Sequence, residues 1–68
     1  MHISARERAI LELLVRGLSN KEIGSELSLS EQTVKNYLFK LNGKMGTRDR
    51  VGLALTAVAS AVVTNPHR

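Results

Sequence analysis

The 68-residue sequence contains no cysteine and no tryptophan, and it has only one proline, one tyrosine and one phenylalanine. Without cysteine, the chain has neither a disulfide framework nor a cysteine-ligated metal site. Because aromatic side chains are scarce, the core has to be built from leucine, isoleucine, valine and alanine. A chain this short is one domain at most and buries only about 60% of the surface that its unfolded form exposes. It therefore has no room for a deep catalytic cleft.

Long apolar runs are also missing. The longest apolar tract, residues 53–63, is interrupted by Thr56 and Ser60 and is far shorter than the ~20 residues that a membrane-spanning helix needs. The charged residues 6–8 stand where a secretory signal would need its apolar stretch. We therefore predict neither membrane association nor secretion, and we expect a cytoplasmic location.

The net charge of +4 is unevenly distributed along the chain. Residues 1–31 carry slightly more acidic than basic side chains, whereas residues 32–48 carry no acid at all. The basic side chains of this second segment are Lys35, Lys40, Lys44 and Arg48. A concentrated positive segment is typical of a surface that binds a polyanion. Charge alone does not distinguish such a surface from an ordinary solvated helix face.

Helix-start signals and apolar spacing predict four helices and no strand. Ser4 with Glu7, and Ser19 with Glu22, form the S-x-x-E pattern of a capping box. The first helix then carries apolar residues at helical spacing and ends at Gly17, a residue suited to a left-handed C-cap. The second helix is very short.

A third helix is predicted over about residues 31–45, with Ser30 as its N-cap. Its buried stripe consists of Val34, Leu38, Leu41 and Met45. The opposite face carries Lys35, Asn36, Phe39, Lys40 and Gly43.

A fourth helix is predicted over about residues 49–63, starting at Asp49 or Thr47 and stopping before Pro66. This helix is apolar on more than one side. One small domain has a single core, so the second apolar side has to be covered by something else. The candidate residues for that contact are Val51, Leu55, Val58 and Val62.

The second and third helices, over about residues 19–45, are joined by a tight turn at residues 27–30. This is the plan of a helix-turn-helix, in which one helix braces against the DNA backbone and the next lies in the major groove. Lys35 and Asn36 carry donors that reach base edges. Candidates for the flanking phosphate contacts are Lys21, Thr33, Tyr37, Lys40, Lys44 and Arg48. Short helix pairs with a basic face also occur in protein-binding modules.

Five segments together carry a family resemblance: SARER (4–8), GLSNKEI (17–23), LSEQTVKNY (29–37), KMG (44–46) and RDR (48–50). At these separations, roughly residues 3–62 strongly resemble the LuxR/NarL/GerE family of helix-turn-helix DNA-binding domains. The resemblance implies an all-α, four-helix domain in a bacterial transcription regulator that binds double-stranded DNA. Many family members are output domains of two-component response regulators or quorum-sensing regulators, and some are stand-alone proteins. A nucleoid-associated location is therefore expected. Whether this segment stands alone or follows an N-terminal receiver or sensor domain stays open.

The resemblance also implies roles for single residues. Base-edge contacts are implied for Lys35, Asn36 and Phe39. Contacts to the DNA backbone are implied for Asn20, Lys21, Thr33, Tyr37, Lys40 and Lys44. The fourth helix is implied to form the contact of a homodimer. The sequence departs from the family at three positions, because Phe39 replaces a small or polar residue, Gly43 a frequent basic residue and Gly24 an alanine.

Several alternatives stay open at this point. Tyr37 fits a packing role as well as a phosphate contact, and Lys44 fits a solvated charge. Phe39 beside Gly43 would also suit an apolar anchor in a protein-interaction module with little DNA affinity. No cofactor or metal site is expected, because His2 and His67 lie near opposite ends of the chain. The sequence has no acid–base pair or activated nucleophile, so it is not expected to be an enzyme.

Overall fold

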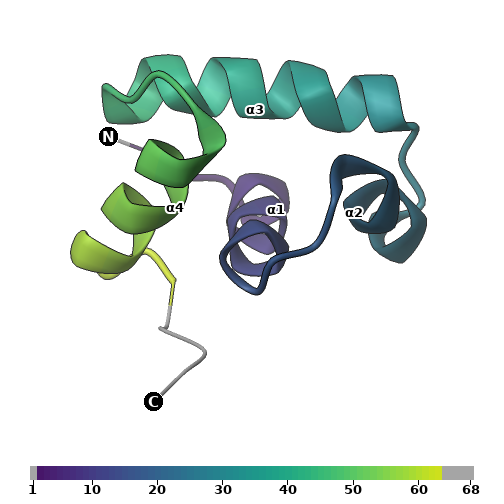
Figure 1. Cartoon of the computed structure of the whole chain (residues 1–68), viewed down its shortest axis with the longest axis horizontal. Coiled ribbons are helices and arrows are strands. Elements are labelled where there is room, and N and C mark those ends of the chain that lie inside the picture. The colour runs from purple at the N-terminus through teal and green to yellow at the C-terminus, as the bar shows by residue number, and fades with distance from the viewer. Residues whose placement is uncertain (1, 64–68) are drawn as a thin grey trace.

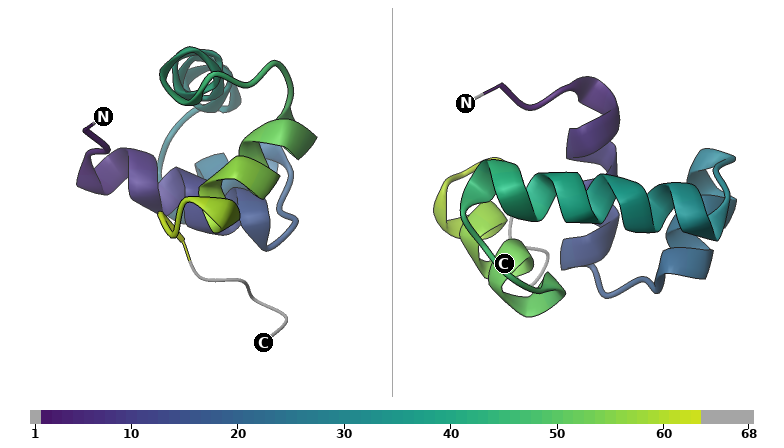
Figure 2. Two further views of the ribbon diagram at one scale, coloured as in Figure 1. Left: turned by 90° about the vertical axis from the view of Figure 1, so that its left-hand side faces the viewer. Right: turned by 90° about the horizontal axis from the view of Figure 1, so that it is seen from above.

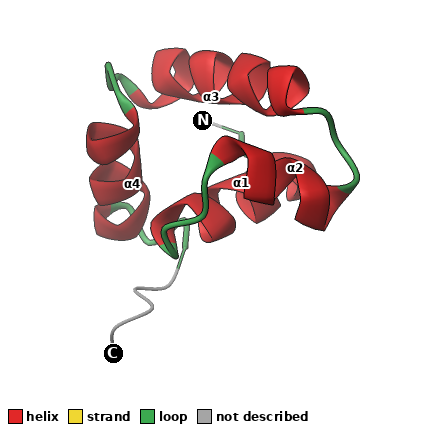
Figure 3. Ribbon diagram, turned by 45° about the vertical axis from the view of Figure 1, so that its right-hand side comes forward, coloured by secondary structure: helices red, strands yellow, loops and turns green. Residues whose placement is uncertain are grey.

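The computed structural model describes residues 2–63, which fold into helices joined by short turns (Figures 1 and 3). The helices are α1 (Ala5–Val15), α2 (Asn20–Leu27), α3 (Glu31–Met45) and α4 (Arg50–Ala59). No strand occurs in this range. The all-α fold class and the bounds predicted for the third helix are confirmed.

Each helix begins at a short polar residue whose side chain accepts a hydrogen bond from the first turn. Ser4 and Ser19 form complete capping boxes with Glu7 and Glu22, as predicted. Ser30 accepts from the backbone N–H of Thr33 at the start of α3. At the start of α4 the cap is Asp49, because its Oδ1 accepts from the N–H of Gly52 at 2.8 Å. These bonds satisfy backbone donors that a helix start otherwise leaves free.

The turn between α2 and α3 is unusually close to α2. Ser28 ends α2 in the left-handed conformation with a φ of 58°, and the N–H of Leu29 donates to the carbonyl of Gly24 at 2.8 Å. A Cβ atom at Gly24 would lie only 2.5 Å from the carbonyl oxygen of Leu29. Gly24 therefore allows the turn to approach α2. This explains why a glycine, which has poor helix propensity, occupies a position inside the helix.

The core lies where the inner faces of the helices meet around α1, which packs against all three other helices (Figure 1). α3 contributes Val34, Leu38 and Leu41 to the core, as the apolar stripe predicts, with Met45 partly buried beside them. The other buried apolar residues are Ile10, Leu11, Leu13, Leu14, Ile23, Leu53, Ala57 and Val63. As expected from composition, this core is aliphatic.

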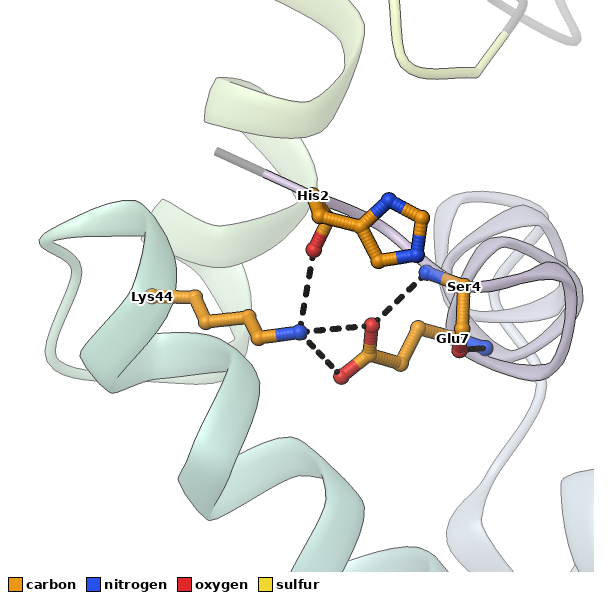
Figure 4. A network of polar contacts seen from close by, with 4 residues as sticks. All are labelled: His2, Ser4, Glu7 and Lys44. Atoms are coloured by element: carbon orange, nitrogen blue, oxygen red, sulfur yellow. Dashed lines mark hydrogen bonds and ion pairs between the residues drawn. The ribbon is translucent and has the colours of Figure 1, made fainter.

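An ion pair joins the start of α1 to the last turn of α3 (Figure 4). The Nζ atom of Lys44 lies 2.8 Å from each carboxylate oxygen of Glu7 and donates to the carbonyl of His2 at 3.0 Å. Glu7 is only 4% exposed, and its Oε1 also accepts from the N–H of Ser4. The hydrogen bond from Lys44, then that from Ser4, lower the pKa of Glu7 against the opposing effect of burial.

The C-terminal end of α4 departs from the sequence prediction. The apolar pattern predicts a helix to about Val63, but α4 ends at Ala59, so that part of the prediction is wrong. Ala61 adopts a left-handed φ of 58°, and Arg8 donates to the carbonyl of Val62. This turn buries Val63 in the core. Burying a valine contributes about 1.5–3 kcal/mol, which offsets the roughly 1–2 kcal/mol cost of a left-handed residue.

No helix within residues 2–63 has both the length and the apolar character needed to cross a membrane.

Replacing Lys44 by methionine tests the ion pair. Lys44→Met keeps a long unbranched side chain but leaves the carboxylate of Glu7 nearly buried without its cation. We expect the free energy of unfolding at neutral pH to fall by roughly 1.5–3 kcal/mol, measured by urea denaturation. The double variant Glu7→Gln/Lys44→Met should lose less than Lys44→Met alone, because no unpaired charge remains buried.

The same ion pair determines how the stability of the fold changes with pH. The folded-state pKa of Glu7 is lowered from 4.5, so its contribution is present above that pH and is lost as the pH falls through the folded-state value. In Glu7→Gln this contribution is absent. The decline in stability as the pH falls below about 5 should then be shallower than in the original chain. An equally steep decline would show that Glu7 is not the titrating group.

Candidate nucleic-acid interface

One side of α3 is free. The helix lies along one side of the molecule, with α1, α2 and α4 all on its inner side (Figure 2). The exposed residues that we call the outer face of α3 are Lys35, Asn36, Phe39, Lys40 and Gly43. The sequence pattern assigns all five to this face, and the structure confirms that they are exposed. The face carries two lysines and no acidic side chain, so it presents a positive surface.

A shallow hollow of about 120 Å³ lies beside this face, lined by Thr33, Asn36, Tyr37 and Lys40. Thr33 is held by a hydrogen bond from the hydroxyl of Ser30 to its own hydroxyl oxygen at 2.8 Å. Tyr37 is partly buried and packs against the core while it lines the hollow. Tyr37 can therefore pack against the core and still present part of its side chain at the hollow.

The amide of Asn36 is oriented by a residue that sequence reasoning did not single out. The side-chain nitrogen of Gln32 donates to Oδ1 of Asn36 at 3.0 Å. The two residues are four positions apart on α3, so helical spacing alone would have placed them together. The bond turns the Nδ2 group of Asn36 away from Gln32. Asn36 thus presents two donors together with an oxygen that has a second lone pair.

Phe39 stands on the outer face with 84% of its surface exposed. One turn further along α3, a Cβ atom at Gly43 would meet nothing within 4 Å. The aromatic ring therefore borders open space and is flanked on the helix by Lys35 and Lys40. An exposed ring of this kind offers an apolar contact within a basic surface.

Lys44 does not belong to the outer face. The phosphate contact implied for Lys44 stays a prediction. The alternative of a freely solvated charge is wrong, because its ammonium group pairs with Glu7 and with the carbonyl of His2. The pattern could not reveal this, because Lys44 and Glu7 are 37 positions apart.

The start of α2 carries two more predicted site residues. Lys21 is exposed and Asn20 is half-buried. Oδ1 of Asn20 accepts a hydrogen bond at 2.8 Å from Arg50, the first residue of α4. Arg50 also donates to the carbonyl of Leu18 at 2.9 Å. Sequence reasoning did not identify Arg50, because a contact across 30 positions leaves no local signal.

α4 leaves part of its apolar surface uncovered. Val51 and Leu55 are 65% and 67% exposed and lie one turn apart. Val58 and Val62 are partly buried and pack against the core, and Val62 lies beyond the end of the helix. Of the predicted four-residue stripe, only Val51 and Leu55 are largely exposed, because the core already uses the other two.

The sequence profile of the family described as bacterial regulatory proteins, luxR family, matches residues 1–57. The chain belongs to this family. The resemblance inferred from the segments between residues 4 and 50 is thereby confirmed. The family is one of regulatory proteins and not of enzymes.

Relatives of this luxR-family chain include two named transcriptional regulators and a spore germination protein. The probable HTH-type transcriptional regulator GfsR of Streptomyces halstedii is 48% identical over 48 residues, covering 71% of this chain and 20% of that protein. The DNA-binding transcriptional activator DevR/DosR of Mycobacterium tuberculosis is 42% identical over 55 residues, covering 81% and 25%. The spore germination protein GerE of Bacillus subtilis is 44% identical over 48 residues, covering 71% and 65%. The chain thus spans between a fifth and two thirds of the length of these relatives.

A solved structure supports the same assignment. The crystal structure of the response regulator ChrA, from a heme-sensing two-component system, superposes on this chain with a TM-score of 0.88 and 35% sequence identity. The match covers 93% of this chain and 31% of ChrA. The four-helix helix-turn-helix architecture is therefore that of the corresponding part of a response regulator.

Proposed function

We propose that this chain binds double-stranded DNA in a sequence-specific manner as part of a bacterial transcription regulator, with α3 in the major groove. The observation that carries the proposal is the outer face of α3, where exposed lysine, amide and aromatic groups line one side of a helix. An α-helix with side chains is about 10–12 Å across, and the major groove is about 12 Å wide. Relatives of the chain are named as DNA-binding or transcriptional regulators.

The base-reading residues in this proposal are Lys35, Asn36 and Phe39. Lys35 donates to guanine acceptors, and the amide of Asn36 pairs with adenine through two hydrogen bonds. Phe39 packs on the methyl group of a thymine, the apolar contact that the major groove offers.

The backbone-binding residues surround this reading surface. Thr33, Tyr37 and Lys40 line the hollow beside α3, and Asn20 and Lys21 come from the start of α2. Contacts of this kind hold a protein in register on DNA without reading its sequence. Lys44 is left out of the set, because its ion pair with Glu7 uses its charge within the protein.

We further propose that two copies pair through α4. Val51 and Leu55 give each copy an exposed apolar contact, and twofold homodimers are the commonest assembly of identical chains. A receiver or sensor domain outside this segment, and a cytoplasmic location on the nucleoid, belong to the same proposal. ChrA, a response regulator of which this chain matches 31%, supports the additional domain.

A protein-interaction module is the competing function, and the 84% exposed Phe39 is the observation that favours it. DNA affinity as a function of salt distinguishes the two. A DNA-binding domain loses affinity steeply as salt rises, because phosphate contacts release counterions. A module that uses this surface only for proteins would show no such affinity.

Lys35→Ala should reduce discrimination between DNA sequences. We expect a loss of about 1–3 kcal/mol on a site selected from a random pool, because a base-edge donor is removed. Lys40→Ala is the matched control, and it should weaken all duplexes alike and reduce the salt slope by about 1. Fluorescence anisotropy titrations on the selected and random duplexes measure both effects. Unchanged discrimination in Lys35→Ala would refute its role as a base contact.

Phe39→Ala should lower affinity for a thymine-containing site and leave the melting temperature nearly unchanged, because 84% of the residue's surface is exposed. Replacing thymine by uracil removes only the methyl group from the DNA. The uracil duplex should therefore weaken binding by the original chain at one position, and it should have no effect on Phe39→Ala. Equal effects of uracil on both proteins would place the ring away from any thymine.

Leu55→Asp should abolish cooperative binding to a duplex with two half-sites, and binding to each single half-site should persist. The exposed position of Leu55 means that the variant should keep its melting temperature. Val58→Asp is the contrasting variant, and it should lower the melting temperature because Val58 packs against the core. Sedimentation with and without the two-site duplex measures the assembly. Unaltered cooperativity in Leu55→Asp would remove α4 as the dimer contact.

A further inference from the structure

Arg50, the first residue of α4, makes hydrogen bonds to the chain on both sides of the N-cap of α2. Its Nη1 donates to Oδ1 of Asn20 at 2.8 Å, and its Nη2 donates to the carbonyl of Leu18 at 2.9 Å. Leu18 precedes the N-cap Ser19, and Asn20 follows it. A single guanidinium group therefore holds both the backbone entering α2 and the first side chain of that helix.

The chemistry of arginine decides which way the amide of Asn20 points. A guanidinium group has only donors, whereas the amide of asparagine has an acceptor oxygen on one side and an NH₂ donor on the other. Only the oxygen can face Arg50, so the Nδ2 group must be turned to the opposite side. Within residues 2–63, that Nδ2 group donates no hydrogen bond. It is therefore available to an external acceptor.

This orientation is the one that a phosphate needs. Phosphate oxygens only accept hydrogen bonds, so an amide that presents its oxygen outward would repel the DNA backbone instead of binding it. Without Arg50, the terminal torsion of the Asn20 side chain has two broad and roughly equal orientations. Arg50 removes one of them before DNA arrives, so the contact forms without further ordering of the side chain.

We propose that Arg50 is a positioning residue for DNA binding, and that it acts by fixing the amide of Asn20 in its phosphate-donating orientation. The inference rests on the proposed function and adds to it a residue of α4 that does not itself contact DNA. Arg50 immediately precedes the exposed Val51, so the helix proposed to pair two copies also orders a backbone contact of α2.

The salt dependence of DNA affinity distinguishes two roles for Arg50: orienting Asn20, or contacting a phosphate directly. A cation that neutralises a phosphate adds about 0.9 to the slope of log affinity against log salt on duplex DNA. A neutral amide adds nothing to this slope. If Arg50 acts by orienting Asn20, Arg50→Met lowers affinity by the same factor at every salt concentration. Lys21→Ala is the control for a direct contact and should reduce the slope by about 0.9.

The experiment is a double-mutant cycle with the 68-residue chain and a labelled pool of random-sequence duplex DNA. Asn20→Ala alone should weaken binding by about three- to tenfold, the net effect of one hydrogen bond. Arg50→Met alone should weaken it by about twofold, because about half of the Asn20 amides would then present their oxygen to the phosphate. In the Asn20→Ala background, Arg50→Met should weaken binding little further. An equal loss in both backgrounds, or a salt slope reduced by about 0.9 in Arg50→Met, would overturn the proposal.

Asn20→Asp separates orientation from folding. The carboxylate still accepts from Arg50, and an acidic residue in the first turn of α2 suits the helix dipole. This variant should therefore melt no lower than the original chain, yet it should lose at least the affinity that Asn20→Ala loses, because its donor is gone and its negative charge repels a phosphate. Asn20→Asp thus tests the proposal even if Arg50→Met does not fold. Binding of Asn20→Asp equal to that of the original chain would overturn the proposal.

The outcomes also separate this inference from the proposed function. If the original chain shows no salt-dependent affinity for the random duplex pool, the proposed function itself fails. If the chain binds, and Lys35→Ala loses discrimination while Asn20→Ala binds unchanged, only the role of Arg50 and Asn20 fails.

Discussion

Burial of Val34, Leu38 and Leu41 sets the rotation of α3 about its own axis. Side chains of a helix have fixed angular positions, so the three buried residues also determine which others point outward. Lys35, Asn36 and Phe39 are exposed as a direct consequence. A turn of α3 by one residue would bring a lysine against α1 and remove the aliphatic contacts of the core. In a domain with so few core residues, that cost is large compared with typical net stabilities of about 5–15 kcal/mol.

The position of α3 along its axis depends on polar contacts at its two ends. At the N-terminal end, the close turn after Gly24 joins it to α2. At the C-terminal end, Lys44 holds the last turn to Glu7 of α1. Together with the core, these contacts place a straight, exposed helix face on a scaffold that is otherwise small. The proposed reading surface is therefore preorganised in the free protein, which limits the entropic cost of binding.

The exposed apolar groups have a functional interpretation in the same terms. Phe39, Val51 and Leu55 are the large hydrophobic residues left uncovered among residues 2–63. They lie on two different helices, one on the proposed DNA-binding face and the others on the proposed dimer contact. Neighbouring exposed apolar side chains, such as Val51 and Leu55, can mark a surface that a partner covers. Arg50, which lies beside Val51 and holds Asn20, connects the second surface to the start of α2.

Caps and apolar spacing are local properties, and from these the sequence by itself determined much of this protein. Ser4, Ser19 and Ser30 mark the helix starts, and the stripe of α3 identifies its inner and outer faces, because each signal involves residues within one or two turns. The family segments extended this to the class of protein. The tertiary structure alone decided the partner of Lys44, the orientation of Asn20 by Arg50, and the end of α4 at Ala59. The ion pair joins residues 37 positions apart, and the arginine contact joins residues 30 positions apart. The end of α4 depends on a core site for Val63 that exists only after folding. Their energies come from burial and charge pairing across helices, which no local pattern encodes.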